Sequence, residues 1–493
     1  GRLSYETGAS VQIDLTTYNW SPLQESTMPY VFYDTETTGV ETTFDQILQF
    51  AAIRTDDDLN ELDRFNMRCR LLPHIVPSPV ALRVTHVTPA MLTDPTLPSH
   101  YQMIRQIRDK LLEWSPATFI GFNSIDFDET LLRQAFFQTL YPAYLTNTNG
   151  NARSDVMRIT HAASIYAPGS IAVPTDNRGR PVFRLNELTL ANGHNHDEAH
   201  EAMADVVATI FVARLVRDRA PHVWQAMTRT ATKNGVKEYV AKQSTFSLTE
   251  RYFGRTHSWL VTPCGRNPDY DGQFAVFDLS FDPDNYRSLS VDDLVKVLNA
   301  SPKAIRSLRA NSQPILMPAG AAPDSTKALR ISPEERQRRV DVIQGDLEFQ
   351  ARVGQAQALR FKDEEPPPYV EQRIYGGFST AGDQSLMEQF HQTDWSERVG
   401  LAAEIHDPRI GEFARRLIYF ERPDVLSDEQ SAQLGAWIAE RVLTEDDSVP
   451  WMTVKKAIRE ADALCLDANG EDADLLEQIK EFLYGFAERL GSA

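Results

Sequence analysis

Asp34 and Glu36 stand one residue apart inside a strand-like run, VFYDTETTG, at residues 31–39. Side chains of a strand alternate between its two faces, so both carboxylates point the same way. Neighbouring carboxylates repel each other and raise each other's pKa unless a cation neutralises them. Hard divalent ions such as Mg²⁺ prefer carboxylate oxygens. The doublet is therefore either a metal site or an acidic, solvated strand end, and alone it does not decide between the two.

Three further residues follow with suitable chemistry. Asp128 comes after a short apolar strand and a polar turn, and opens a helix-like segment, where a carboxylate is also an ordinary cap. His200 and Asp205 open a second helix, in the segment AHEAMADV at residues 199–206. Five helical steps rotate one from the other by about 140°. They meet at one site only if His200 lies at or before the first turn and Asp205 lies within the helix.

Together these residues form the pattern D-x-E, then N-x3-F-D, then H-x4-D, which resembles the DEDDh superfamily of 3′-to-5′ exonucleases. Longer segments resemble bacterial exonuclease I. They are DVMR at 155–158, FRLNELTLANG at 183–193, AHEAMADV at 199–206, THSW at 256–259 and YGGF at 375–378. The likeness is strongest in the first half of the chain and thin after residue 300.

The resemblance implies processive 3′-to-5′ hydrolysis of single-stranded DNA with release of 5′-mononucleotides, in DNA repair and recombination. It implies two Mg²⁺ ions, for which Mn²⁺ can substitute. Asp34, Glu36 and Asp205 are the expected direct ligands, and Asp128 is the acid expected to hold one metal through water. His200 is the expected general base, because an imidazole near its unperturbed pKa suits that role at neutral pH.

Predictions for substrate contacts rest on single positions. The expected substrate-binding residues are Glu36, Arg133, Tyr144, Arg158, Arg184 and Lys233. Arginine and lysine side chains would bind phosphates, and Tyr144 would stack on a base. A lone tyrosine is more often part of the packing than a stacking platform. Asn123, in the N-x3-F-D motif, is expected to orient its turn.

The length of 493 residues suggests about three domains. We predict an N-terminal extension at 1–27, an exonuclease domain at 28–220, a connector and second domain at 221–365, and an all-helical domain at 366–493. Strands at 31–36, 46–55 and 64–72, followed by a helix, a strand and further helices, indicate an α/β fold with an RNase H-like mixed sheet.

The middle of the chain changes character. Residues 164–181 read as a loop, 220–245 as a basic helical connector, and short β-type runs separated by Pro and Gly turns begin at 246. The family resemblance implies an SH3-like barrel in this region, with helical insertions around 290–310 and 333–354.

The formal net charge of −19 is unfavourable for a DNA-binding protein unless positive charge is concentrated locally. Residues 421–493 hold 17 acidic and 7 basic side chains, whereas 213–242 carries a net +5 and 301–360 a net +4. Because the first basic cluster directly follows the H-x4-D motif, we interpret it as part of a nucleic-acid track.

Other features narrow the class of protein. No run of 18 or more apolar residues is present, so no membrane span is expected. The first residues lack a basic start followed by an apolar stretch, so we expect no secretory signal. Cys69, Cys264 and Cys465 are odd in number and far apart, which predicts neither a disulfide framework nor a metal site. A monomeric protein of the cytoplasm fits these observations.

Alternatives remain at this stage. One is a DEDDh enzyme that acts on RNA or short oligonucleotides or proofreads for a polymerase, although such chains lack the extra downstream mass. Others are a non-enzymatic single-strand-binding module and a metal-dependent phosphatase. The resemblance also implies docking of the acidic tail of single-stranded DNA-binding protein, but Ser164 and Ala226 stand where the family has Arg and Tyr.

Overall fold

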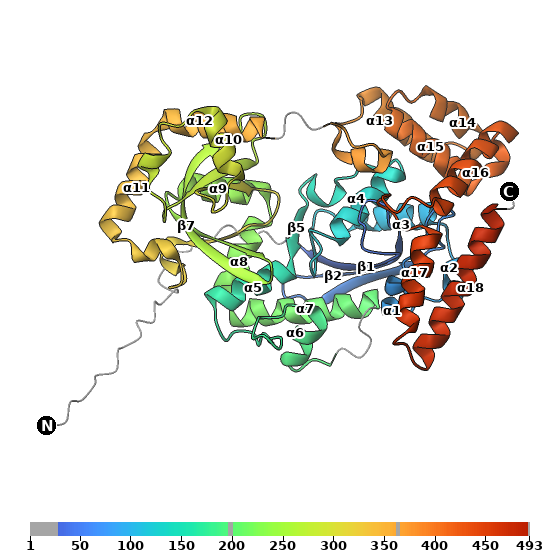
Figure 1. Ribbon diagram of the computed structural model, residues 1–493, viewed down its shortest axis with the longest axis horizontal. Helices are drawn as coiled ribbons and strands as arrows, with labels where there is room; N and C mark the ends of the chain where they lie inside the picture. Colours follow the sequence, from blue (N-terminus) through green and yellow to red (C-terminus); the bar gives the residue numbers. More distant parts are fainter. Residues whose placement is uncertain (1–27, 196–200, 361–364, 492–493) are drawn as a thin grey trace. The chain divides into compact units, whose positions relative to one another are not determined.

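The computed structural model describes residues 28–195, 201–360 and 365–491 (Figure 1). Among these residues, 28–157, 184–195, 201–214 and 365–491 form one compact unit, the mixed-sheet unit. Residues 158–183 and 215–360 form the second, the antiparallel-sheet unit. The division follows the density of contacts, so the expected boundaries at 220 and 365 stay predictions.

A five-stranded mixed sheet is the centre of the first unit. Its strands are β1 (Tyr30–Thr37), β2 (Ile47–Thr55), β3 (Glu61–Arg68), β4 (Thr118–Gly121) and β5 (Ala152–Asp155), in the order β3-β2-β1-β4-β5. The β1–β2 and β2–β3 pairs are antiparallel, and the β1–β4 and β4–β5 pairs are parallel. The predicted α/β fold with an RNase H-like mixed sheet is therefore confirmed.

The third strand was expected at 64–72 but lies at Glu61–Arg68. It is an edge strand, and polar residues such as Asp63 and Arg64 pair with β2 although their side chains are partly or largely exposed. The polar residues before position 64 are therefore compatible with a strand, because one face of an antiparallel sheet can face water.

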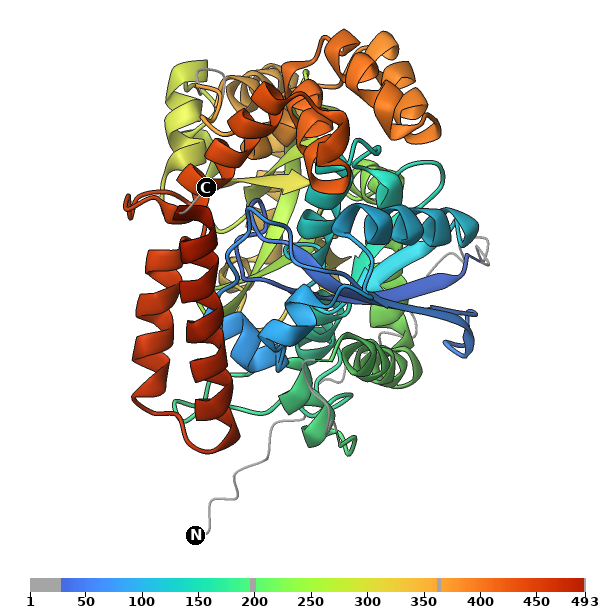
Figure 2. The ribbon, with the colours of Figure 1, turned by 90° about the vertical axis from the view of Figure 1, so that its right-hand side faces the viewer.

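Helices cover both faces of this sheet (Figures 1 and 2). The helices between residues 79 and 219 are α1 (Pro79–Thr85), α2 (Pro89–Thr93), α3 (His100–Glu113), α4 (Asp128–Gln138), α5 (Val156–Tyr166), α6 (Leu185–Ala191) and α7 (Ala202–Arg219), with the 3₁₀ turn η2 (Leu145–Asn147). Most of α5 and the end of α7 belong to the antiparallel-sheet unit. Val31 and Tyr33 of β1 are buried in one core with residues of α3 and α4. The alternate residues, Asp34 and Glu36, therefore face the other way.

The C-terminal region is all-helical, as predicted. It contains α13 (Ala381–Gln392), α14 (Trp395–Glu404), α15 (Pro408–Glu421), α16 (Asp428–Leu443), α17 (Val454–Cys465) and α18 (Glu471–Gly491), with η6 (Val370–Tyr375) and η7 (Pro423–Val425). Phe390, Phe413 and Leu417 belong to the same buried cluster as Val31 and Leu131, so these helices share a core with the sheet. The α17–α18 hairpin packs beside α1 (Figure 2).

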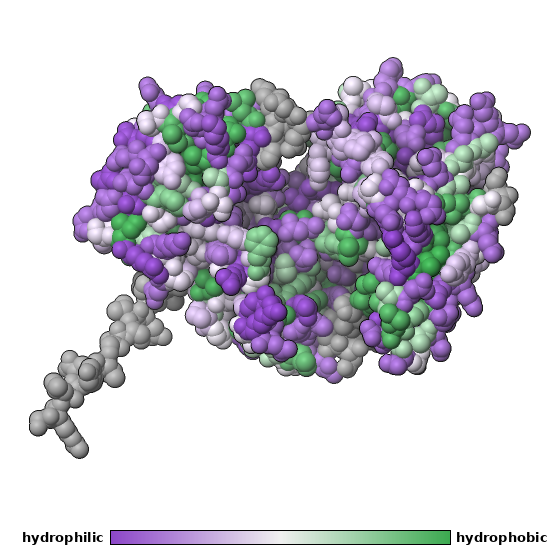
Figure 3. Space-filling model, viewed as in Figure 1, coloured by the Kyte–Doolittle hydropathy of each residue, from purple (hydrophilic) through white to green (hydrophobic). Residues whose placement is uncertain are grey.

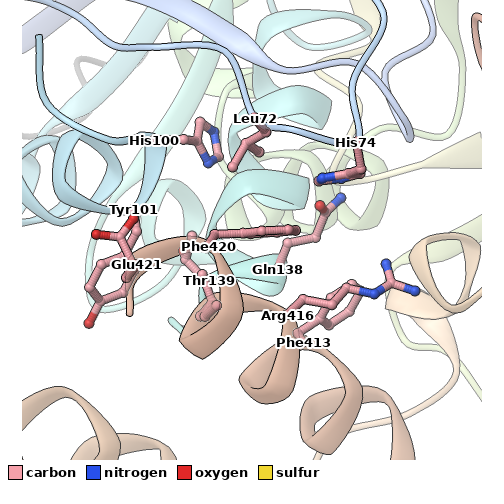
Figure 4. A pocket seen from close by; sticks show the side chains of 11 residues that line it. Leu72, His74, His100, Tyr101, Gln138, Thr139, Phe413, Arg416, Phe420 and Glu421 are labelled. Carbon is pink, nitrogen blue, oxygen red and sulfur yellow. The ribbon is translucent and has the colours of Figure 1, made fainter. Parts of the chain in front are cut away.

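Buried charge and aromatic stacking join α15 to η6, to α16 and to the segment after β3 that carries His74. Glu371 accepts hydrogen bonds from Arg416 Nη1 (2.8 Å) and Arg441 Nη1 (3.0 Å). His74 stacks on Phe420 with ring centroids 5.0 Å apart, beside a small cavity (Figure 4). Burial, then the charges of Arg441 and Arg416, hold the pKa of His74 well below its usual value. This histidine is therefore a neutral part of the packing.

The second unit contains a five-stranded antiparallel sheet. Its strands are β6 (Phe246–Tyr252), β7 (Arg255–Arg266), β8 (Gln273–Asp278), β9 (Ile305–Arg309) and β10 (Ile315–Pro318), in the order β10-β6-β7-β8-β9. Its further helices are α8 (Pro221–Thr230), α9 (Lys233–Lys242), α10 (Val291–Asn299), α11 (Pro333–Gly345) and α12 (Leu347–Leu359), with η3 (Pro283–Asn285), η4 (Ala319–Ala321) and η5 (Lys327–Arg330).

Two local predictions in this unit were wrong in extent. The helical insertion expected at 290–310 ends at Asn299, and the residues from Ile305 form β9, where Ile305 and Leu308 are buried against the sheet. The loop expected from residue 164 begins later, because α5 continues to Tyr166. Ser164 tolerates the helix because its hydroxyl donates to the carbonyl of His161, three residues earlier.

Within the described residues, every helix is too short or too polar to cross a membrane. The visible face of the mixed-sheet unit in Figure 3 is largely hydrophilic, with apolar patches scattered among charged side chains. Cys69, Cys264 and Cys465 are all free thiols, as the sequence predicted.

Candidate active site

Three carboxylates meet on the face of β1 that points away from α3 and α4. Asp34 and Glu36 come from this strand, and Asp205 comes from the first turn of α7. One ligand atom from each side chain lies within 4.8 Å of the others. Glu36 is only 7% exposed. An all-carboxylate donor set of this kind fits a hard divalent cation, so the doublet is not a solvated strand end.

Electrostatics point to the same conclusion. The pKa of Asp34 lies well above its usual value, chiefly because the group is buried and next because of the charges of Asp128 and Asp205. Burial is also the largest cause that raises the pKa of Glu36 to about 9, followed by Asp205 and Asp128. The cation of Arg68 acts in the opposite direction on Glu36. Four acids crowded in this way need protons or metal ions to neutralise them.

Asp128 lies beside the three carboxylates but makes its own contacts. It opens α4, as predicted, and its Oδ1 accepts hydrogen bonds from Thr35 N (3.1 Å) and Thr35 Oγ1 (2.6 Å). The pairing of β1 with β4 ends at Phe32, so the Thr35 amide has no strand partner there and Asp128 takes its place. Burial raises the pKa of Asp128 to about 7, against the lowering effect of these hydrogen bonds.

Asp205 lies within α7, as the H-x4-D spacing requires of it if it is to share a site with His200. His200, the expected general base, lies outside the described residues. Asn123 adopts a left-handed conformation (φ 61°), and its backbone N–H donates to Asp155 Oδ1 at 2.9 Å. A role for Asn123 in its turn therefore fits the backbone geometry, since Asn tolerates this conformation better than most residues.

The raised pKa values predict that divalent cations stabilise the protein more as the pH rises. The folded carboxyls keep protons that the unfolded chain has lost, so the free energy of unfolding of the metal-free protein falls between about pH 4 and the folded pKa values, about 7 for Asp128 and about 9 for Glu36. A bound cation removes this penalty. We expect the increase in Tm on adding Mg²⁺ to be larger at about pH 8.5 than at about pH 6.

Thermal unfolding with and without Mg²⁺ at the two pH values measures this difference. Asp205→Asn serves as the control, because it removes one of the three ligands and should reduce the Mg²⁺ response at both pH values. An equal shift of Tm at both pH values in the unchanged protein would contradict the prediction.

Arg133 and Tyr144, two expected substrate contacts, lie together in the mixed-sheet unit. The Arg133 guanidinium sits over the Tyr144 ring at 5.1 Å from its centroid, and its Nε donates to Glu129 Oε1 at 3.0 Å. Tyr144 makes an edge contact with Phe378, whose side chain is 86% exposed. Phe378 belongs to the YGGF motif, but the residues around it in the sequence do not indicate a contact with Tyr144.

The other expected substrate contacts have partners of their own. Arg184 is largely exposed and pairs with Glu187 at 2.8 Å. In the antiparallel-sheet unit, Arg158 donates to the carbonyl of Ser312, and Lys233 pairs with Asp271. Lys237 pairs with Asp271 as well, so this one carboxylate is shared by two lysines of the basic cluster at 213–242. Arg184 belongs to the same unit as the carboxylates, whereas Arg158 and Lys233 belong to the other unit.

Similarity to known proteins decides the family. A family model described as exonuclease matches residues 31–213, and one described as exonuclease I C-terminal domain matches residues 368–486. Exodeoxyribonuclease I of Haemophilus influenzae is 30% identical over 382 residues, which cover 73% of this chain and 79% of the relative. This chain belongs to the exonuclease I family. It is therefore an exonuclease, and the family predicted from the motifs is confirmed.

Other members of the exonuclease I family agree. Exodeoxyribonuclease I of Escherichia coli is 27% identical over 405 residues, covering 78% of this chain and 84% of the relative. The structure of a moderately thermophilic exonuclease I from Methylocaldum szegediense matches 93% of this chain and all of its own, with a TM-score of 0.80 at 26% identity. An E. coli exonuclease I structure in complex with a dA16 oligonucleotide has the same TM-score at 23% identity and supports the fold.

Two positions bear on the docking mode that the exonuclease I family implies for single-stranded DNA-binding protein. Ala226 is fully buried in α8, and Ser164 directs its hydroxyl to the carbonyl of His161. Neither position offers the cation or the aromatic ring that the family carries there. The side chains at these two positions therefore do not support docking of an acidic tail there.

Sequence reasoning missed a buried network around Glu129, next to the site. Glu129 is 1% exposed and accepts hydrogen bonds from Tyr33 (3.1 Å), Arg133 (3.0 Å) and Thr146 (2.5 Å). Arg153 adds an ion pair at 3.3 Å. A charge so deeply buried is normally paired in this way. In the sequence, only its position directly after Asp128 set Glu129 apart, and an acidic residue at that position is equally typical of an ordinary helix start.

Proposed function

We propose that this protein is a Mg²⁺-dependent exodeoxyribonuclease I that degrades single-stranded DNA processively from the 3′ end and releases 5′-mononucleotides. The convergence of Asp34, Glu36 and Asp205 within 4.8 Å, in a chain of the exonuclease I family, carries this proposal. The oligonucleotide complex of the E. coli enzyme supports the choice of substrate. Mn²⁺ is the expected substitute for Mg²⁺, since both are hard ions that prefer oxygen ligands.

The side chains divide the reaction among them. Asp34, Glu36 and Asp205 would hold two divalent ions, which supply charge neutralisation and a more acidic water when bound. Asp128 would contribute through water, with its carboxylate oriented by the two hydrogen bonds from Thr35. His200 would take the proton of the attacking water, because a neutral imidazole is the side chain best matched to that transfer near pH 7.

Tyr144 and Phe378 are the proposed stacking surface for bases of the single strand. Their rings lie 6.1 Å apart, and the Arg133 guanidinium lies over the Tyr144 ring and is itself held by Glu129. Base stacking on aromatic side chains tolerates any sequence, as an exonuclease requires. Arg158, Arg184 and Lys233 remain proposed phosphate contacts, and binding would require each to exchange or share its present partner.

Removing the Tyr144 ring should weaken substrate binding more than catalysis. Stacking of one base contributes about 1–3 kcal/mol, so Tyr144→Ala should raise KM for a single-stranded oligonucleotide roughly 5- to 150-fold, with a much smaller change in kcat. Tyr144→Phe, which keeps the ring, should resemble the unchanged protein. Tyr484→Ala on α18 removes a half-exposed tyrosine that is not part of the proposed stacking surface, and it should leave KM unchanged. Steady-state kinetics measure all three, and an unchanged KM in Tyr144→Ala would contradict the stacking role.

Digestion of matched substrates tests the proposed function directly. Single-stranded DNA, RNA of the same sequence and duplex DNA, each labelled at the 5′ end, are incubated with and without Mg²⁺. We expect progressive shortening of single-stranded DNA alone, and only with Mg²⁺. Equal or faster shortening of RNA would favour the alternative, a DEDDh exonuclease acting on RNA or short oligonucleotides. Equal digestion of duplex would contradict the single-strand preference.

A further inference from the structure

Gln49 links the strand that carries Glu36 to the start of α7. In the antiparallel register of β1 and β2, Gln49 stands directly opposite Glu36, so the two side chains share a face of the sheet. Gln49 is only 1% exposed. Its Nε2 donates to Glu201 Oε1 at 2.7 Å and to Asn66 Oδ1 at 2.9 Å.

Glu201 connects Gln49 to the first turn of α7. Its second carboxylate oxygen, Oε2, accepts from the backbone N–H of Ala204 at 3.0 Å, as an N-cap side chain does. Its carbonyl accepts from the N–H of Asp205 at 3.0 Å. A carboxylate at this end is also favoured by the helix dipole. One side chain therefore joins the sheet to the turn that presents Asp205.

We propose that Gln49 is a positioning residue for the reaction, which acts through Glu201 on the first turn of α7. That turn carries Asp205, and in the chain it follows His200 directly. The inference rests on the proposed function and deepens it. A shift of about 1 Å in a catalytic group can lower a rate about 100-fold, so an anchor at this point acts on kcat more than on substrate binding.

A purely structural role for Gln49 predicts a different outcome. Within the described residues the Gln49 Oε1 atom is buried and makes no hydrogen bond, which is unfavourable for stability. Methionine has nearly the same volume and no polar group to desolvate, so Gln49→Met should fold as well as the unchanged protein. Glu201 is partly exposed and can be hydrated once its donor is lost. A structural residue would thus leave kcat unchanged, whereas a positioning residue would not.

The test compares Gln49→Met with an exchanged pair. We expect Gln49→Met to keep its Tm within a few degrees while kcat on single-stranded DNA falls roughly 10- to 100-fold and KM changes little. Gln49→Glu places two carboxylates face to face and should be at least as impaired. Adding Glu201→Gln restores one donor and one acceptor with the same net charge, so the double variant should recover most of the lost kcat. Gln134→Met, at a buried glutamine of α4 that donates to the Glu371 carbonyl, is the matched control with unchanged kcat.

The outcomes separate the two proposals. Unchanged kcat in Gln49→Met, or no recovery in the exchanged pair relative to Gln49→Glu, would overturn the positioning role while the unchanged protein still digests DNA. If Gln49→Met fails to fold, recovery in the exchanged pair decides the matter alone. Absence of Mg²⁺-dependent digestion in the unchanged protein would instead refute the proposed function, and the positioning role with it.

Discussion

Asp34→Ala is expected to lower Mg²⁺-dependent digestion of single-stranded DNA by about 10³-fold or more, because the ions held by this cluster supply several kcal/mol of transition-state stabilisation. Asp205→Ala should have an effect of the same size, since its carboxylate completes the group within 4.8 Å. Binding of the single strand should survive in both variants. The proposed stacking surface of Tyr144 and Phe378 is not changed by either substitution.

Unfolding does not provide an alternative explanation for such a loss. Burial and the neighbouring acids raise the pKa of Asp34, so in the metal-free protein this group is a source of repulsion. Alanine removes that repulsion, and the Tm of the metal-free variant should equal or exceed that of the unchanged protein. Initial rates on labelled oligonucleotide, together with binding measured by fluorescence anisotropy in chelator, separate catalysis from binding. Glu113→Ala removes an exposed acid of α3 and should keep full activity. Full activity in Asp34→Ala or Asp205→Ala would refute the metal assignment.

Local periodicity explains why much of the catalytic fold could be predicted from the sequence. Strands β1 and β2 are largely buried, and Asp34 and Glu36 stand at alternate positions of β1. Alternation along β1 was sufficient to place Asp34 and Glu36 on one face. It could not show that β4 stops pairing at Phe32, which is what frees the Thr35 amide for Asp128.

Long-range pairing explains what could not be predicted from the sequence. Lys233 and Lys237 of the basic segment 213–242 both pair with Asp271, more than thirty residues away, and the role of this segment in a nucleic-acid track stays a prediction. Gln49 stands in the buried strand β2, and its partner Glu201 is 152 residues distant in the sequence. Charge counted along the chain does not reveal such partners, because the fold and not the sequence distance brings them together.

Blocking one end of the substrate is the second change for which we expect a large effect on the rate of digestion. A phosphate at the 3′ end should slow digestion of single-stranded DNA about 100-fold or more, whereas a blocking group at the 5′ end should have little effect on the initial rate. A 3′ phosphate carries close to two negative charges near neutral pH. In a 3′-to-5′ exonuclease the terminal 3′ hydroxyl enters the site first, so this dianion would compete with the scissile phosphodiester for the ions proposed at Asp34, Glu36 and Asp205. A terminal phosphate in that place would keep the scissile bond away from the ions, which makes the blocked strand a poor substrate.

The matched substrates for this test differ only at their ends. One oligonucleotide carries a 3′ phosphate and a 5′ label, the second carries a free 3′ hydroxyl and a bulky 5′ group, and the third is the first after treatment with a phosphatase. Because the phosphatase restores the hydroxyl without changing sequence or label, digestion of the third should return to the rate of an unblocked strand. Resistance of the 5′-blocked strand together with rapid digestion of the 3′-phosphorylated one would refute the proposed polarity, even if the carboxylates prove essential, because the metal site alone does not determine which end of the strand enters it.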